Sequence, residues 1–225
     1  MTSSTESQTL GRSAEDVYDR LLEAGIVAEP DGESGIRLTS EYFEHRSETR
    51  SRKSEAGRDA LLRAAGATDG PLAECADDAL VTEAVAVLTF GAELSESEAF
   101  RVATSIHAVR DDDADGVPAS FLRLHPAQIP GFLSAYDAGV ILCWREDCPP
   151  CQRMADRLAE LVAETPDVTV AAVRGTDDPA LLSKRYDVAV APTLLFCADG
   201  AVRSRLIGVN TEATVRRELT TLSES

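Results

Sequence analysis

Two cysteines, Cys148 and Cys151, are the residues of this chain whose type and spacing most clearly permit chemistry. They enclose Pro149 and Pro150 and follow the segment Trp144–Asp147. If a helix begins here, this spacing places the two thiols one turn apart, so that a disulfide can form between them. The pattern therefore predicts a dithiol that is oxidised to a disulfide and reduced again.

The elements around these cysteines are expected to be a buried strand and a helix. Residues 139–144 form a continuous apolar run, which predicts a strand buried on both faces. Residues 149–163 repeat apolar side chains on one face, as in an amphipathic helix. Cys148 would then lie at the helix N-terminus, where unpaired N–H groups and the helix dipole stabilise a thiolate. Because Cys151 should be more buried, we expect Cys148 to attack and Cys151 to resolve.

Trp144 and the Cys-x-Pro-Cys motif, together with a second segment at Tyr186–Phe196, resemble the thioredoxin family. The resemblance covers residues 119–225 and implies an α/β thioredoxin fold, a central mixed sheet flanked by helices. The residues before it predict a mostly helical N-terminal domain. The order of the expected elements fits: strands near 120–125, 139–144, 168–173, 193–197 and 201–207, and helices near 127–136, 149–163, 178–186 and 211–222.

The resemblance also implies a substrate-binding segment at Ala191, Pro192 and Thr193. In the family, the proline that corresponds to Pro192 follows a cis peptide bond and lies against the disulfide. A cis X-Pro bond is uncommon in folded proteins, so its use by the family marks a functional position. The backbone at Ala191 is expected to pair with an extended substrate, and Gly208 matches a glycine that the family also has after its last strand.

Two positions depart from the family pattern. The family's buried acid, which helps to deprotonate the resolving cysteine, would fall at Leu142, so resolution here would rely on water. The tryptophan usual before the first cysteine is replaced by Asp147. Its carboxylate disfavours a thiolate at Cys148, in opposition to the helix terminus, and would make the pair more reducing. The residues expected to support the active site are Trp144, Asp147, Pro149 and Pro150.

The other cysteines and the histidines do not predict a metal site. A zinc site needs a second pair of ligands, and the spacing supplies none among His45, His107, His125 and the remaining cysteines. Cys75 is expected to be a half-exposed thiol without a role. Cys143 and Cys197 lie in apolar strands and are expected to be small buried hydrophobes, with a regulatory thiol as the alternative. We therefore predict no bound cofactor; the redox group is the disulfide itself.

Composition indicates where this chemistry takes place. The 225-residue chain carries a net charge of −17, which argues against nucleic acid or an anionic membrane as partners. Acid excess and only two lysines, Lys53 and Lys184, resemble the proteins of salt-loving archaea; an acidic protein of an ordinary cytoplasm is the alternative. The opening residues resemble no signal peptide and no apolar run is long enough to span a bilayer, so we expect a cytoplasmic protein in which a CxxC motif is catalytic.

The first half of the chain is less informative. Residues 1–12 are expected to be disordered, residues 13–110 to form a mainly helical accessory domain, and residues 111–118 to be an acidic linker. Within the accessory domain we expect a helix from Ser13, a small hairpin with a turn at residues 30–32, a helix capped by Thr39, and further helices near 77–90 and 95–109. The segment Leu21–Phe43 resembles part of a winged-helix module and is followed by basic residues, so a winged-helix module is the alternative interpretation.

Two functions of different class follow. The first is a thioredoxin-like reductase of protein disulfides that uses Cys148 and Cys151 and takes electrons from a thioredoxin-reductase-like flavoprotein or a low-molecular-weight thiol. The second is a redox-sensing adaptor whose helical half binds a partner, with DNA the less favoured case. An oxidant or isomerase would use the same residues and differ only in its reduction potential.

Overall fold

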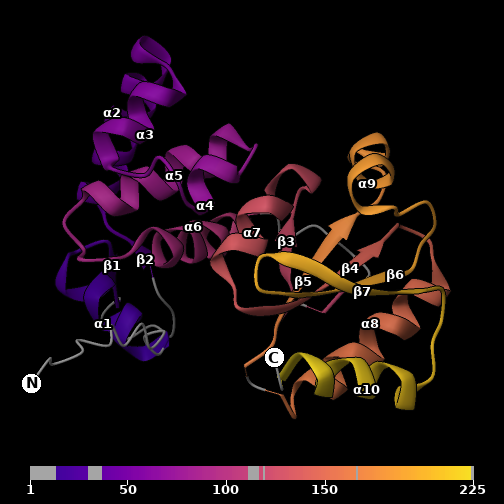
Figure 1. Ribbon diagram of the computed structural model, residues 1–225. Helices are drawn as coiled ribbons and strands as arrows, with labels where there is room; N and C mark the ends of the chain where they lie inside the picture. The colour runs from indigo at the N-terminus through magenta and orange to yellow at the C-terminus, as the bar shows by residue number, and fades with distance from the viewer. Residues whose placement is uncertain (1–13, 30–36, 111–116, 119, 166, 224–225) are drawn as a thin grey trace, which may run out of the picture.

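The computed structural model describes residues 14–29, 37–110, 117–118, 120–165 and 167–223 (Figure 1). Three expectations fall outside these residues: the disordered segment 1–12, the turn at residues 30–32 and nearly all of the acidic linker 111–118. Among the described residues, none of the helices combines the length and apolar character needed to cross a lipid bilayer.

The C-terminal half is built on a mixed sheet of five strands in the order β3-β5-β4-β6-β7. Strands β3, β5 and β4 are parallel, whereas β6 and β7 run antiparallel to their neighbours. The strands are β3 Leu122–Leu124, β4 Ala138–Trp144, β5 Thr169–Arg174, β6 Thr193–Ala198 and β7 Ala201–Ile207. The helices are the 3₁₀ turn η1 Pro126–Gln128, α7 Ile129–Ala135, α8 Pro149–Val162, α9 Pro179–Tyr186 and α10 Glu212–Ser223. The expected α/β architecture and its element order are confirmed.

Alternate residues of the central strands face two separate cores, as the period of a strand requires. Val140, Leu142 and Trp144 of β4 belong to a cluster that includes apolar residues of α8 and α10. Ile141 and Cys143 of the same strand belong to a second cluster on the opposite face. Both faces are therefore covered, which explains why β4 is a continuous apolar run in the sequence.

The N-terminal half is mainly helical, as expected. Its elements are α1 Ala14–Glu23, β1 Val27–Ala28, β2 Arg37–Leu38, α2 Ser40–Ala56, α3 Arg58–Ala65, α4 Pro71–Glu74, α5 Asp78–Thr89 and α6 Glu96–Arg110. Strands β1 and β2 pair antiparallel, and Thr39 caps α2 by accepting a hydrogen bond from the backbone N–H of Tyr42. A winged-helix function for this region stays a prediction.

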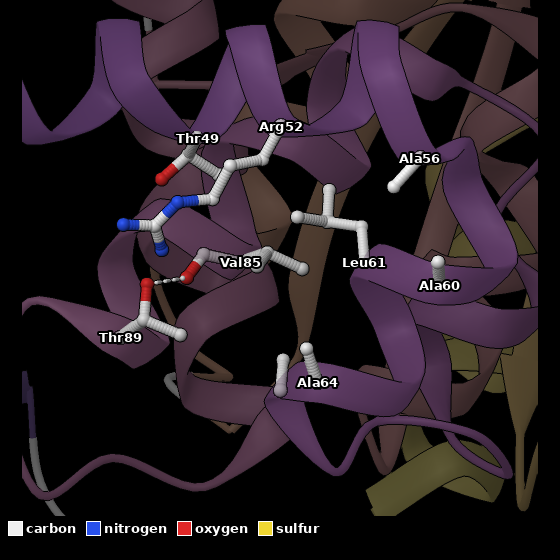
Figure 2. Close-up of a pocket in the computed structure, with 9 residues that line it drawn as sticks. Thr49, Arg52, Ala56, Ala60, Leu61, Ala64, Val85 and Thr89 are labelled. Carbon is white, nitrogen blue, oxygen red and sulfur yellow. Dashed lines mark hydrogen bonds between the residues drawn. The ribbon is translucent and has the colours of Figure 1, made fainter.

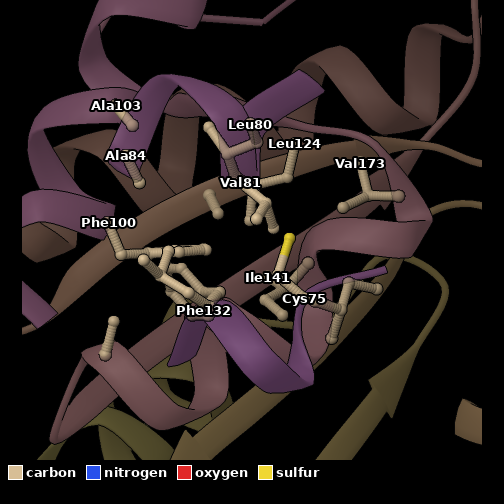
Figure 3. Close-up of a cluster of buried hydrophobic side chains, with 14 of the residues drawn as sticks. Cys75, Leu80, Val81, Ala84, Phe100, Ala103, Leu124, Phe132, Ile141 and Val173 are labelled. Atoms are coloured by element: carbon tan, nitrogen blue, oxygen red, sulfur yellow. The ribbon is translucent and has the colours of Figure 1, made fainter. Parts of the chain in front are cut away.

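The second core joins the helical half to the sheet (Figure 3). Leu80, Val81 and Phe100 from α5 and α6 pack in one cluster with Phe132 of α7 and Ile141 of β4. The packing is close, because a Cβ built on Gly131 of α7 would lie 2.3 Å from the ring of Phe100. The two halves therefore share one hydrophobic core instead of meeting through a linker alone.

Cys75 lies within this shared core, and the expectation of a half-exposed thiol is wrong. Its exposed fraction is 0%, and its side chain lies beside Ile141 in Figure 3. The sequence around Cys75 is rich in Asp and Ala and gives no local sign of burial. The covering residues come from the distant elements that form the cluster, so only the tertiary packing buries this thiol.

Hydrogen bonds fix the position of the helical half relative to the C-terminal half. The backbone N–H of Ala76 donates to the carbonyl oxygen of Ala127 at 3.0 Å, and Gln128 Nε2 donates to Asp77 Oδ2 at 2.8 Å. The guanidinium of Arg101 donates from Nε to the carbonyl oxygen of Ala135, the last residue of α7, at 2.9 Å. Buried and part-buried carbonyl groups are thereby satisfied at the boundary, as a native interface requires.

A buried carboxylate, Glu83 of α5, ties three helices of the N-terminal half together. It is 2% exposed, accepts a hydrogen bond from Tyr42 Oη at 2.8 Å and pairs with Arg46 Nε at 2.5 Å, both from α2. His107 Nε2 of α6 lies 3.8 Å from the same carboxylate. His107 therefore lies at a contact between α5 and α6.

Candidate functional site

The CxxC pair lies at the corner between β4 and α8. Cys148 is the residue that caps α8, and its Sγ accepts a hydrogen bond from the backbone N–H of Cys151 at 3.2 Å. The two cysteines form a disulfide with their Cα atoms 5.2 Å apart. Pro149 and Pro150 occupy the first helical positions, where a missing N–H is tolerated and the fixed φ of proline suits the helix. The sequence therefore folds locally into a helix N-terminus that holds one sulfur.

The two cysteines differ in burial, as the sequence predicted. Cys148 is 9% exposed, whereas Cys151 is 1% exposed beneath it. Both belong to the cluster that contains Trp144, which is 3% exposed and packs beside them. An incoming thiol or disulfide therefore meets Cys148 first. The backbone N–H of Cys151 would stabilise negative charge on Cys148 Sγ, because hydrogen bonding to the charged form of a group favours that form.

The segment Ala191–Thr193 lies beside the end of β4. Cys143 pairs with Thr193 across the sheet, so the residues just before Thr193 adjoin the end of β4 that leads to the disulfide. The Ala191–Pro192 peptide bond is cis, and Ala191 packs against the cluster that holds both cysteines. Thr193 is buried and its hydroxyl donates to the carbonyl oxygen of Val190 at 2.8 Å. The structure thus brings the two sequence motifs together.

Gly208 closes this side of the site. Its N–H donates to the carbonyl oxygen of Pro192 at 2.8 Å, and its φ of +76° lies in the left-handed region that favours glycine. Another backbone bond, from the N–H of Gly175 to the carbonyl oxygen of Trp144 at 2.7 Å, holds the opposite side. The end of β4 that leads to Cys148 is therefore flanked by the segment after β5 on one side and the segment before β6 on the other.

Charged side chains surround the loop that leads to Cys148. Arg174 donates to Glu146 at 2.6 Å and lies 3.0 Å from Asp177, and the hydrogen bond to Glu146 is the main reason that the pKa of Arg174 is raised. Asp147 is exposed and has a φ of +50°. Leu142, at the position of the family's buried acid, is fully buried among apolar side chains. Resolution by Cys151 therefore has no carboxylate at that position.

Exposed apolar side chains beside the cis peptide were missed by the sequence-based reasoning. Val190 is 52% exposed, Ile207 59% and Val209 47%, and all three lie next to residues that bond or pair with the Pro192 segment. The sequence did contain a pattern from which the exposure of Ile207 could have been predicted. Because strand residues alternate, it shares a face with Arg203 and Arg205, which point to solvent. Val190, Ile207 and Val209 are thus exposed apolar side chains on the two chain segments that meet at the cis peptide.

No metal centre is found in the part of the chain that the structure describes: no three His, Cys, Asp or Glu side chains there are arranged to hold an ion. Cys143 and Cys197 are 1% and 3% exposed, which confirms their expected burial. Neither lies in the cluster of the CxxC pair.

Comparison with known proteins identifies relatives of this site. A family model described as thioredoxin matches residues 132–221. A thioredoxin from Mycolicibacterium smegmatis is 33% identical over 78 residues, which cover 34% of this chain and 70% of that protein. A thioredoxin from Chlamydia pneumoniae is 31% identical over 80 residues, covering 35% of this chain and 78% of that protein. The crystal structure of oxidised mitochondrial thioredoxin 3 from Saccharomyces cerevisiae is 23% identical, with a TM-score of 0.42, and covers 45% of this chain and 95% of its own.

Proposed function

The chain belongs to the thioredoxin family of thiol–disulfide oxidoreductases, and from this premise we propose that it reduces protein disulfides through the dithiol of Cys148 and Cys151. The observation that carries the proposal is the asymmetry of the pair. Cys148 is the more exposed residue of the pair, and its Sγ accepts a hydrogen bond at the start of α8. A thiolate at Cys148 is favoured there, and the thiolate is the nucleophile in disulfide exchange.

The reaction proceeds in two exchanges. The Cys148 thiolate attacks one sulfur of the substrate disulfide, forms a mixed disulfide and releases the other substrate sulfur as a thiolate that takes up a proton. Cys151 then loses its proton to water and attacks the sulfur of Cys148. This step forms the Cys148–Cys151 disulfide seen in the structure and releases the second substrate thiol. Two electrons have passed from the protein to the substrate.

The exposed apolar side chains beside the cis peptide, Val190, Ile207 and Val209, support a polypeptide as substrate. An extended chain that lies along Val190, Ala191 and Val209 can pair its backbone with that of Ala191 and cover the exposed valines. Recognition through the backbone implies a broad range of protein substrates. The disulfide is returned to the dithiol by a thioredoxin-reductase-like flavoprotein or a low-molecular-weight thiol.

The test compares three serine variants in the reduction of insulin by a small dithiol. Cys148→Ser should abolish turnover, because no nucleophile remains at the accessible position. Cys151→Ser should accumulate a mixed disulfide with the substrate, detectable by mass, because the resolving thiol is missing. Cys197→Ser, a buried thiol in the other core, is the matched control and should keep turnover within about twofold of the original protein. Turnover by Cys148→Ser would refute the mechanism.

A further inference from the structure

The helical half contains a pocket that is remote from the disulfide in the fold and that the redox chemistry does not use. It has a volume of about 260 Å³ and lies between α2, α3 and α5 (Figure 2). Its walls include the alanines Ala56, Ala60, Ala64 and Ala65, with Leu61 and Val85 as the larger apolar side chains. We propose that this pocket binds a small organic acid, with its apolar body among the alanines and its carboxylate on Arg52.

The pocket exists because small side chains stand where two helices diverge. Helices α2 and α3 are separated by a single residue, Gly57, whose φ of +83° turns the chain sharply. Only Tyr42 and Thr49 of the 17-residue α2 are buried, so this helix contributes almost nothing to fill the space. Alanine side chains cannot reach across it, so a hollow open to solvent remains, and Ala56 and Ala64 in its wall are exposed. An apolar guest would remove this apolar surface from water.

The size of the pocket restricts that guest. An apolar cavity of about 150 Å³ accommodates benzene, and drug-sized ligands occupy pockets of about 300–1,000 Å³. A volume of about 260 Å³ lies between these limits. It suits a short alkyl chain or a single substituted ring, and it is too small for a helix of a partner protein.

The polar groups of the pocket select the charge of the guest. The Thr49 hydroxyl donates to the carbonyl oxygen of His45 at 3.0 Å, and the Thr89 hydroxyl donates to that of Val85 at 2.8 Å, so both hydroxyl protons are already engaged. Figure 2 shows the Arg52 guanidinium at the end of the pocket near these threonines, away from Ala56 and Ala60. The pocket therefore has one cationic end and one apolar end.

Arg52 is available to an anion. Its side chain is 65% exposed, and its partner Glu48 is equally exposed at 3.7 Å, a separation at which an ion pair contributes little. The planar fork of a guanidinium matches a carboxylate through two parallel hydrogen bonds. The net charge of −17 repels a second negative charge that the guanidinium of Arg52 would not neutralise. A monocarboxylate fits better than a phosphate ester.

The experiment is a calorimetric titration of the full chain with octanoate, with octan-1-ol and acetate as comparators. It uses the lowest salt concentration at which circular dichroism shows the protein folded. Octanoate should bind saturably with one site, acetate should not bind because it lacks an apolar body, and octan-1-ol should bind at least about fivefold more weakly. No saturable binding of octanoate, or equal binding of octan-1-ol, would overturn the proposal.

Variants locate the site. Arg52→Gln should weaken octanoate binding about fivefold or more. Arg50 is an exposed cation on the same helix that does not line the pocket, so Arg50→Gln should leave octanoate binding unchanged. Ala64→Leu should fill the pocket and abolish octanoate binding. If Ala64→Leu does not fold, Ala60→Leu is used in its place. If the filled variant binds octanoate as the original protein does, the pocket is not the site. Equal losses in Arg50→Gln and Arg52→Gln would refute the role of Arg52.

Discussion

Burial separates the three remaining thiols from the CxxC pair at the residue scale. Desolvation raises the pKa of Cys75 to about 11 and the pKa values of Cys143 and Cys197 to about 12. Because the thiolate is the reactive form, these thiols are almost wholly protonated at neutral pH. The same burial denies a reagent access. We therefore expect the proposed redox chemistry of the folded protein only at Cys148 and Cys151.

Alkylation with iodoacetamide after gentle reduction tests this separation. Cys148 should react first and Cys151 more slowly, while the other three thiols react only once the chain is unfolded in denaturant. Even at pH 9, Cys75, Cys143 and Cys197 should react far more slowly than Cys148, because their pKa values keep the thiolate fraction at about 1% or less and burial denies the reagent access. Rapid modification of any of the three in the folded protein, measured by peptide mass, would contradict this account.

At the scale of elements, the sequence predicted what depends on local periodicity. The apolar run at 139–144 and the amphipathic repeat at 149–163 correspond to β4 and α8 within two residues. Both could be predicted because they depend only on the local pattern of apolar residues. The expectation that the Pro192 segment lies near the disulfide came only from the family resemblance, and the pairing of Cys143 with Thr193 was not predicted. Burial of Cys75 could not be predicted, because the residues that cover it are distant in sequence.

Asp77 shows how one side chain joins two elements. Its carboxylate caps α5 by accepting from the N–H groups of Ala79 and Leu80 at 2.8 and 3.0 Å, and it also accepts from Gln128 Nε2. Burial alone would raise the pKa of Asp77, but these hydrogen bonds outweigh it and the pKa is lowered. The charged carboxylate therefore stabilises the fold above its unfolded pKa, and this contribution is lost as the pH falls through the folded pKa.

Asp77→Ala should lower the free energy of unfolding by about 1–2 kcal/mol at pH 7, the usual cost of a lost N-cap. The cost should shrink at a pH below the folded pKa, where the original carboxyl group is protonated. Urea unfolding at pH 7 and in acid measures both values, with the exposed Asp69→Ala as the control. If both variants lose the same stability at pH 7, or if the cost of Asp77→Ala does not depend on pH, the capping argument fails.

The shared core makes the two halves interdependent at the scale of the whole molecule. Phe132, Ile141 and their neighbours on one face of the sheet are covered by α5 and α6. Exposing a large buried apolar side chain to water costs about 1.5–3 kcal/mol of stability, and the free energy of unfolding of a domain is only about 5–15 kcal/mol. The boundary between the helical half and the thioredoxin half in the sequence therefore does not imply that the second half is stable alone. A partner-binding role of the helical half stays a prediction.

A fragment that comprises residues 117–225 tests this dependence. We expect it to bind a hydrophobic dye and to unfold at least about 10 °C below the full chain, since about 2 kcal/mol moves the melting temperature of a domain of this size by that amount. Calorimetry and dye fluorescence on the fragment and the full chain provide the comparison. A fragment that melts with the full chain and binds no dye would show that the helical half is dispensable for stability.

The net charge of −17 makes the stability of the whole chain depend on the salt concentration. Repulsion between the surface carboxylates reaches about 10 Å in 0.1 M salt but only about 3 Å in 1 M salt. We therefore expect the folded fraction, followed by circular dichroism, to fall on dilution from about 3 M to below about 0.2 M potassium chloride. Unchanged stability across this range would argue against adaptation to high salt and for the ordinary cytoplasm.

The measurement that tests the central claim most directly is a redox titration of Trp144 fluorescence in a dithiol buffer. Trp144 is the only tryptophan of the chain and packs in the cluster that contains both sulfurs of the disulfide, so its emission should report the redox state. The proposed reductase predicts a midpoint near that of thioredoxin, about −270 mV. A midpoint near −120 mV, the value of a strong oxidant, would contradict it and assign the pair to disulfide formation.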